Sequence, residues 1–292
     1  MWQQKSFNDE QNKGILYLVP TPIGNLEDMS YRAVRILKEA DFIAAEDTRN
    51  TVKLCHYFEI DTSIISYHEH NKRASGEKIV SKLRDGAKVA LVSDAGMPTI
   101  SDPGYELVRE AIAEQLTVVP LPGANAALTS LIASGLETQP FYFYGFLNRQ
   151  KKEKRKELEN LLYQKGTLLF YESPHRLKET LALMQEAFGN RNIVLCRELT
   201  KKFEEFIRGT LTEIIEWAHR DEIRGEFCIV VEGSSEQEIL EQSSWWEELS
   251  IPEHVNQYMT EKGMSSKDAI KQVANDRELM KRDVYQAYHV EN

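Results

Sequence analysis

The chain has 292 residues, of which 36 are Lys or Arg and 46 are Asp or Glu, so its formal charge at neutral pH is −10. The hydrophobic fraction of 41% and the charged fraction of 28% are ordinary for a folded protein and exclude a disordered chain or a long coiled coil. No apolar stretch approaches the roughly 20 residues of a membrane span. The length favours about two domains, and the N-terminus lacks the layout of a signal peptide.

The cysteines and histidines predict neither a disulfide framework nor a metal site. Cys55, Cys196 and Cys228 are odd in number and far apart, which is typical of a protein in a reducing compartment. The pair His68 and His70 comes without further ligands at zinc-site spacing. We therefore expect a cytoplasmic protein with no membrane contact and no metal.

The first half of the chain alternates short apolar runs with helical patterns, after a polar arm at residues 1–14. This alternation predicts a parallel sheet with helical crossovers and hence an α/β fold. The predicted strands are residues 15–19, 42–45, 64–67, 89–92 and 117–120, and the predicted helices are residues 31–40, 77–84, 105–114 and 125–133.

The second half continues the alternation, but two of its strands lie too close in sequence for a helical crossover. The predicted strands are residues 141–146, 167–171, 193–197, 203–207 and 227–231, and the predicted helices are residues 151–163, 175–187 and 212–218. The close pair at 193–197 and 203–207 predicts an antiparallel hairpin. We place a domain boundary near 136–140, which gives α/β domains at 15–137 and 138–235. A polar linker at 234–244 and a helical tail at 245–292 follow.

Three loops rich in glycine and proline follow strands of the first half, at residues 20–26, 93–104 and 121–127. Ligands of α/β proteins bind where such loops leave the carboxyl ends of strands. Each loop alone is explained by ordinary turn chemistry, but three at successive strand ends favour a binding site. The glycine patterns of dinucleotide-binding and phosphate-binding loops are missing. The loops therefore favour a small, polar ligand without phosphate, held largely by backbone groups.

A basic cluster interrupts the otherwise acidic chain. Within eight positions six basic residues face one acidic residue, Glu153, which gives a local charge of +5; the basic residues are Arg149, Lys151, Lys152, Lys154, Arg155 and Lys156. A solvated helix face is one explanation. Cations at the start of a helix oppose its dipole, however, so a polyanion such as RNA explains the placement equally well.

Taken together, several of these segments resemble a known family. They are residues 19–26 (VPTPIGNL), 46–49 (EDTR), 91–104 (LVSDAGMPTISDPG), 121–126 (LPGANA), 171–176 (YESPHR) and 197–205 (RELTKKFEE). In this order they resemble the ribosomal RNA small subunit methyltransferase I family, which has the tetrapyrrole-methylase fold of class III S-adenosylmethionine-dependent methyltransferases. The resemblance covers residues 14–233, and the tail is similar more loosely. One departure is Lys72, where the family commonly has an acidic residue.

The resemblance implies two α/β domains with a ligand cleft between them, a small helical C-terminal tail and a homodimer. It implies S-adenosylmethionine as the cofactor and 2′-O-methylation of a cytidine ribose in the decoding region of small-subunit (16S) ribosomal RNA. The cofactor-binding residues carried over are Pro22, Gly24, Asp94, Ala95, Gly96, Pro98, Ser101, Gly123, Ala124, Asn125, Ser173 and Pro174.

Methyl transfer to a hydroxyl group is helped by a base that accepts its proton. The residue types and their positions at strand ends give the candidates Glu46, Asp47, His68, His70 and Glu172. We favour Glu46 and Asp47, with Arg49 gripping a phosphate or holding a carboxylate.

For RNA contact we predict the basic cluster together with Lys201 and Lys202. The substrate partner is then ribosomal RNA or the assembled small subunit. Two alternatives keep the fold: a methyltransferase for a tetrapyrrole-type small molecule, and a non-catalytic RNA-binding assembly factor.

Overall fold

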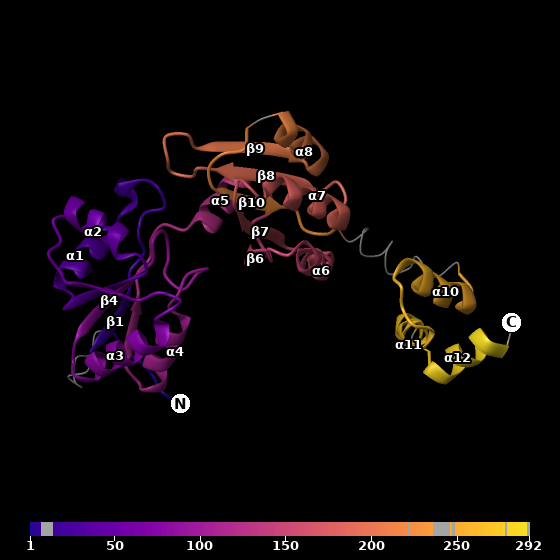
Figure 1. The fold of residues 1–292 in the computed structure, drawn as a ribbon, viewed down its shortest axis with the longest axis horizontal. Coiled ribbons are helices and arrows are strands. Elements are labelled where there is room, and N and C mark those ends of the chain that lie inside the picture. The colour runs from indigo at the N-terminus through magenta and orange to yellow at the C-terminus, as the bar shows by residue number, and fades with distance from the viewer. Residues whose placement is uncertain (7–13, 221, 236–245, 247–248, 278, 291–292) are drawn as a thin grey trace. The chain divides into compact units, whose positions relative to one another are not determined.

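The computed structural model describes residues 1–6, 14–220, 222–235, 246, 249–277 and 279–290. The chain divides into two compact units, Met1–Gly233 and Ser234–Asn292. The larger unit holds two five-stranded sheets with their helices, and the smaller unit is helical (Figure 1). The predicted class, α/β with a helical tail, is confirmed. No helix within the described residues has the length and apolar character that crossing a membrane would require.

The first sheet is fully parallel and has the order β3-β2-β4-β1-β5. Its strands are β1 (Ile15–Leu18), β2 (Phe42–Ala45), β3 (Ile64–Ser66), β4 (Lys88–Val92) and β5 (Thr117–Pro120). The connecting elements are the short helix η1 (Leu26–Asp28) and helices α1 (Tyr31–Glu39), α2 (Thr48–Tyr57), α3 (Lys72–Arg84) and α4 (Tyr105–Ala113). Because all strands run the same way, their carboxyl ends lie at one edge of the sheet.

Both faces of this sheet are covered, as expected for parallel strands with helical crossovers. Successive residues of β2 point to opposite faces. Ala44 packs in a core with α3 and α4, while Ile43 packs in a second core with α1 and α2. All four residues of β2 are buried.

The second sheet is mixed and has the order β6-β7-β10-β8-β9. Its strands are β6 (Phe141–Phe146), β7 (Thr167–Glu172), β8 (Asn192–Arg197), β9 (Glu205–Thr210) and β10 (Phe227–Val231). Only β6 and β7 pair in parallel; β10 is antiparallel to both β7 and β8. The helices are α5 (Ala126–Ser134), α6 (Lys151–Leu161), α7 (Leu177–Phe188) and α8 (Leu211–Arg220). The antiparallel pairing of β8 with β9 confirms the predicted hairpin.

Helix α5 packs on the second sheet although it precedes the predicted boundary near 136–140. Its buried residues Ala127 and Leu131 share a core with Leu169, Val194 and Val230 of the second sheet. By packing, α5 therefore belongs to the second sheet and the chain crosses between the sheets before it.

Several elements differ from the prediction: helix α3 begins at Lys72 rather than at 77, and the short helix η1 is not predicted. Helix α2 was not predicted, because Thr51 and Cys55 are its only buried residues and leave no clear apolar stripe. Strand β9 begins at Glu205 rather than at 203. The Glu204 carboxylate accepts a hydrogen bond from the Thr200 amide at 2.7 Å, which keeps residues up to Glu204 in the bend.

The smaller unit has three described helices, α10 (Ile251–Glu261), α11 (Ser266–Asp276) and α12 (Lys281–Val290). They pack around a core that includes Val255, Ile270, Val273 and Val284. Ser250 begins α10 with a capping box. Most of the predicted linker at 234–244 lies outside the described residues, as does part of the N-terminal arm.

Candidate functional site

The three predicted ligand loops meet at the carboxyl edge of the first sheet. They follow β1, β4 and β5, and β1 lies between the other two strands. The backbones of Thr21 and Gly96 exchange two hydrogen bonds, of 2.9 and 3.0 Å, which tie the first loop to the second. Asn125 in the third loop caps α5, because its side chain accepts a hydrogen bond from the Leu128 amide at 2.9 Å.

Two glycines allow the loops to approach one another. Gly96 has a φ of +80°, a conformation that other residues rarely adopt. A Cβ atom on Gly24 would lie 2.5 Å from Cγ of Lys201 and 2.8 Å from Oγ1 of Thr200. The first loop therefore packs directly against the bend that follows β8 of the second sheet.

Backbone strain gathers at the same loops. Six non-glycine residues of the described chain have a positive φ, and four of them are Thr99, Ser101, Glu198 and Thr200. The first two lie in the loop after β4 and the other two in the bend after β8. Such residues cost on the order of 1–3 kcal/mol each and tend to cluster at binding sites.

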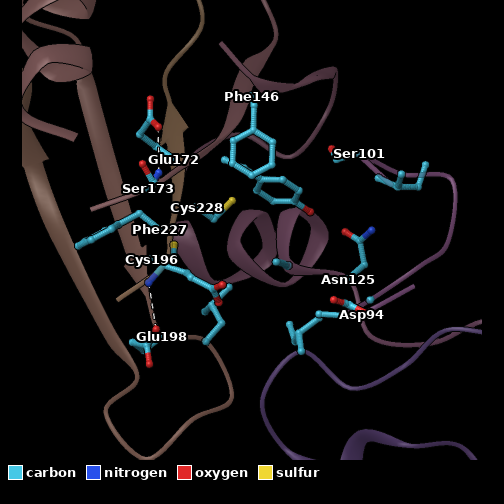
Figure 2. A pocket seen from close by; sticks show the side chains of 18 of the residues that line it. Asp94, Ser101, Asn125, Phe146, Glu172, Ser173, Cys196, Glu198, Phe227 and Cys228 are labelled. Atoms are coloured by element: carbon cyan, nitrogen blue, oxygen red, sulfur yellow. Dashed lines mark hydrogen bonds between the residues drawn. The ribbon is translucent and has the colours of Figure 1, made fainter. Parts of the chain in front are cut away.

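A cavity of about 470 Å³ lies between these loops and the ends of β7, β8 and β10. Figure 2 shows Asp94, Asn125 and Ser101 on one side of it, with Phe146, Ser173, Cys196 and Phe227 on the other. The predicted cofactor residues that line the cavity are Asp94, Ala95, Gly96, Ser101, Asn125, Ser173 and Pro174. The remaining predicted residues, Pro22, Gly24, Pro98, Gly123 and Ala124, lie in the same loops but are not among the lining residues.

Much of the cavity wall that the second sheet provides is not predicted from the sequence. The missed lining residues there are Phe146, Tyr171, Cys196, Glu198, Leu199, Glu226, Phe227 and Cys228. Strand β10 is buried along its whole length, so its sequence is that of any core strand. The bend at 197–205 was the available signal, since it supplies Glu198 and Leu199.

The carboxyl group of Asp47 is bound to Arg49. The Arg49 side chain donates to it at 2.5 Å, and the Arg49 amide donates at 2.9 Å, so Asp47 also caps α2. These hydrogen bonds hold the pKa of Asp47 at about 2. Arg49 is largely exposed. Asp47 is therefore a weak proton acceptor, and Arg49 holds a carboxylate.

Glu46, one residue earlier, is in a different environment. Burial and the neighbouring Asp94 carboxylate raise its pKa above the ordinary value, while His68 acts in the opposite direction. Its Oε2 atom is buried and has no hydrogen-bond partner among the described residues. Glu46 is thus better suited than Asp47 to accept a proton.

The other predicted bases are placed unequally. His68 lies beside Glu46, and its Nδ1 atom is buried without a hydrogen-bond partner in the described part of the chain. His70 is exposed, with its ring 5.9 Å from that of His68. Glu172 is buried and accepts a hydrogen bond from the Thr180 hydroxyl at 2.6 Å. Within the described ranges, no three His, Cys, Asp or Glu side chains are grouped as metal ligands.

Asp102 is a lining residue that the sequence analysis did not single out, although it lies in the loop at 93–104. Burial raises its pKa to about 7, and the nearby carboxylates of Glu46 and Asp94 add to this effect. The cavity thus contains a carboxyl group that changes its charge near neutral pH.

The basic cluster is only partly a free surface. Arg149, Lys151, Lys152, Arg155 and Lys156 are exposed. Of these, Arg155 pairs with Glu186 at 2.6 Å, and Lys156 pairs with Glu153 at 3.1 Å.

The two basic residues outside helix α6 also differ. Lys202 is exposed, whereas Lys201 is half-buried and pairs with both Glu198 and Glu226 at 3.0 Å.

The prediction that every basic residue of the cluster contacts RNA is wrong for Lys154. Its side chain is fully buried, and its Nζ atom lies 2.9 Å from both Glu179 and the Thr180 hydroxyl. Lys154 shares a helix face with the buried residues Leu158 and Leu161, so it points into the protein.

Comparison with known proteins agrees with this geometry. Residues 15–215 match the family described as Tetrapyrrole (Corrin/Porphyrin) Methylases. The chain is 62% identical to the ribosomal RNA small subunit methyltransferase I of Bacillus subtilis, over 99% of this chain and 98% of that protein. It is 57% identical to the protein of the same name from Halalkalibacterium halodurans, over the full length of both.

Solved structures share the fold at lower identity. A cobalt precorrin-4 methyltransferase superposes with a TM-score of 0.58 at 17% identity, over 75% of this chain and 94% of that one. The uroporphyrin-III C-methyltransferase of Thermus thermophilus, solved with S-adenyl homocysteine, gives 0.53 at 18%, over 75% and 97%. From the family match and the two full-length relatives, the chain belongs to the tetrapyrrole methylases, in the group of ribosomal RNA small subunit methyltransferases I.

Proposed function

We propose that this protein transfers a methyl group from S-adenosylmethionine to the 2′-oxygen of a cytidine ribose in the decoding region of 16S ribosomal RNA. The observation that carries the proposal is the 62% identity to a ribosomal RNA small subunit methyltransferase I along 99% of the chain. That identity extends over the loops and the helical tail, and so exceeds what a shared fold requires.

The cavity fits the cofactor. Its volume of about 470 Å³ is in the range of small-molecule sites. Apolar side chains such as Ile23, Met97 and Phe227 line it together with polar groups of the loops. Lys201 is the one lysine or arginine among the lining residues, and its two ion pairs leave it no free charge for a phosphate. S-adenosylmethionine has no phosphate, and when bound it supplies a methyl group on a positively charged sulfur.

We assign cofactor binding to the predicted residues that line the cavity, and the shaping of the loops to the other five. Holding the hydroxyl oxygen in line with the methyl group can supply about 7–11 kcal/mol of the barrier reduction. Removing the hydroxyl proton adds a factor of about 10²–10⁴. Glu46 takes part in that removal, and Arg49 keeps Asp47 at the start of α2.

The RNA contact is assigned to exposed basic side chains. Arg149, Lys151, Lys152 and Lys202 are exposed and have no ion pair among the described residues. Arg155 and Lys156 are exposed but share their charge with Glu186 and Glu153. These positions suit an RNA backbone, because phosphate contacts supply most of the affinity that does not depend on sequence.

We further propose a homodimer in the cytoplasm. Leu128 and Ile132, one turn apart on α5, are 46% and 77% exposed, which supports an apolar contact between subunits. The three cysteines are free thiols, as suits a reducing compartment. Light scattering of the purified protein should give twice the chain mass of 33.7 kDa, and Ile132→Glu should give monomers. A wild-type monomer at micromolar concentration would contradict the dimer.

The substrate is tested with isotopically labelled S-adenosylmethionine. The protein is incubated separately with assembled small subunits, naked 16S RNA and a tetrapyrrole, and the label in each is measured. The proposal predicts label in the RNA of at least one of the first two samples. Label in the tetrapyrrole alone would support the small-molecule enzyme, and tight RNA binding without any label would support an assembly factor.

A further inference from the structure

Five carboxyl groups line the cavity, those of Asp94, Asp102, Glu172, Glu198 and Glu226. All of them except Asp102 form hydrogen bonds or ion pairs with other parts of the protein. The Glu198 carboxylate accepts hydrogen bonds from the Glu226 amide at 2.9 Å and from Lys201 at 3.0 Å. Lys201 also pairs with Glu226 at 3.0 Å, so one lysine contacts both glutamates and offsets one of their two negative charges.

Asp94 serves to hold helix α2. Its two carboxylate oxygens accept hydrogen bonds from the Asp47 amide at 3.1 Å and from the Asn50 side chain at 3.2 Å. These bonds join the loop after β4 to the first turn of α2. With both of its oxygens engaged, this carboxylate holds the loop against α2.

Glu172 is engaged on both of its oxygens. One accepts from the Ser173 amide at 2.9 Å, and the other accepts from the Thr180 hydroxyl at 2.6 Å. The Arg176 guanidinium lies 3.3 Å away. With 2% of its surface exposed, Glu172 supports the end of β7 and is closed to a substrate.

Asp102 is the exception among the lining carboxyl groups of the described residues, because it has neither an ion pair nor a backbone N–H donor. The nearby Ser93 hydroxyl acts to lower its pKa, but that hydroxyl donates its hydrogen bond to the Gly96 carbonyl at 3.2 Å. The charged or titratable groups that face it are Glu46 at the end of β2, Asp94 after β4 and Tyr171 on β7. Burial raises the pKa of Tyr171 to about 12, so Tyr171 stays neutral and adds no further negative charge beside Asp102.

The local backbone fixes where Asp102 lies. Ser101, the preceding residue, has a φ of +65°, and Figure 2 shows Ser101 at the edge of the cavity. Gly104 follows with a φ of +140°, and a Cβ there would lie 2.8 Å from Thr99. The loop is therefore held in a strained, tightly packed shape that sets the half-buried Asp102 at the cavity wall.

We propose that Asp102 is a catalytic residue of the methyl transfer and that its carboxylate takes the proton of the 2′-hydroxyl group. This inference rests on the proposed function. As the bond between the 2′-oxygen and the methyl carbon forms, the carbon–sulfur bond breaks and its electron pair stays on sulfur. The hydroxyl proton passes to Asp102, so the products are the methyl ether, a neutral thioether and a protonated carboxyl group.

Glu46 lies near Asp102 as a second carboxyl group that can accept the proton. It is not among the lining residues, but it is close enough to Asp102 to raise the pKa of that group. Two neighbouring carboxyl groups do not readily carry two charges in a partly buried site. We assign Glu46 as the next acceptor of the proton, with His68 beside it.

The experiment measures the rate of a single turnover at saturating S-adenosylmethionine, between about pH 5.5 and 9, with whichever RNA substrate the wild-type protein labels. The wild-type rate should rise with pH and level off above about 7, where Asp102 is ionised. Asp102→Asn should lower the plateau rate by about 100-fold or more and abolish the pH dependence. Its affinity for S-adenosylmethionine, measured by calorimetry, should stay within about threefold of wild type.

Two further variants complete the test. Asp102→Glu keeps a carboxyl group, so its single-turnover rate should be at least about tenfold higher than that of Asp102→Asn. Asp85→Asn makes the same change at an exposed position after α3 and should leave rate and pH profile unchanged. If Asp102→Asn does not fold, the pH profile of the wild-type rate and the single-turnover rate of Asp102→Glu still test the role of Asp102.

Three results would count against Asp102 as the proton acceptor. They are an Asp102→Asn rate close to wild type, a loss confined to cofactor affinity, and a wild-type rate that is flat across neutral pH. A wild-type protein that labels no RNA would instead refute the proposed function itself.

Discussion

Glu46 and Asp47 are adjacent in sequence, yet their surroundings give their carboxyl groups opposite properties. Asp47 accepts hydrogen bonds from Arg49, and its pKa falls to about 2. Glu46 is half-buried beside other carboxylates, and its pKa rises. A general base works best when its pKa lies near the working pH, which favours Glu46.

The roles of Glu46 and Asp47 can be distinguished by replacing each carboxylate with the matching amide. Glu46→Gln should lower the single-turnover rate by about 100-fold, because an acceptor for the proton is removed, and should leave cofactor binding unchanged. Asp47→Asn should mainly lower the melting temperature, because the cap and ion pair of α2 are weakened. Rapid-quench kinetics and calorimetry measure both. Equal rates for Glu46→Gln and wild type would exclude a role for Glu46 in proton removal.

The raised pKa of Asp102 also has a consequence for stability. The folded protein binds a proton at this group up to about pH 7, whereas the unfolded chain releases it near the ordinary aspartate pKa of 3.8. The contribution of Asp102 to the free energy of unfolding is therefore fully present at low pH and is lost as the pH rises toward 7.

Asp102→Asn removes this dependence. The melting temperature of the variant relative to wild type should increase between about pH 4 and 7 and level off above pH 7. Differential scanning fluorimetry over that range measures it. A relative melting temperature that is constant with pH would show that Asp102 titrates normally.

At the scale of elements, helix α6 combines an exposed basic surface with a buried lysine, Lys154. Lys154 lies 2.9 Å from the Thr180 hydroxyl, which in turn donates to Glu172 at 2.6 Å. Through this chain of bonds α6 is connected to α7 and to the end of β7, next to Ser173 in the cavity wall.

Lys154 and Lys152 should therefore respond differently to the same substitution. Lys154→Met should cost about 1–3 kcal/mol of folding stability, because Glu179 and Thr180 would be left without a charged hydrogen-bond partner. Lys152→Met should leave stability nearly unchanged and weaken RNA binding. Urea unfolding and filter binding check the pair. A stable Lys154→Met protein with weakened RNA binding would place Lys154 on the surface.

At the scale of the whole molecule, a net charge of −10 coexists with a small exposed basic surface on α6. Such a distribution disfavours indiscriminate binding of RNA and favours contact at one place. Replacing Lys151 and Lys152 by Glu should weaken RNA binding. The slope of log affinity against log salt should fall by about 0.7–0.9 for each phosphate that is no longer neutralised. An unchanged slope would mean that these lysines are only solvated.

Much of this architecture could be predicted from the sequence, because its causes are local. The buried strands of the first sheet are short apolar runs, and each ligand loop follows one of them directly. Helix α5 shows the limit: its own pattern predicts a helix, but only the tertiary contacts of Ala127 and Leu131 reveal which sheet it covers.

The candidate site was predictable on the side of the loops and not on the side of the second sheet. Cys196 and Cys228 lie opposite each other on the neighbouring strands β8 and β10. No spacing in the sequence indicates that these two free thiols are neighbours. Asp102 is one of several polar residues in its loop, and its distinction depends on burial and on Glu46, which is distant in sequence. For Lys154 a signal existed, since its spacing to Leu158 and Leu161 is that of one helix face.

The central claim is that the methyl group is placed on a ribose oxygen of small-subunit RNA. After reaction with labelled S-adenosylmethionine, that RNA is digested to nucleosides, which are separated and identified by mass spectrometry. We expect the label in 2′-O-methylcytidine. Label in a base-methylated nucleoside, or in no nucleoside while a small molecule is methylated, would contradict the claim.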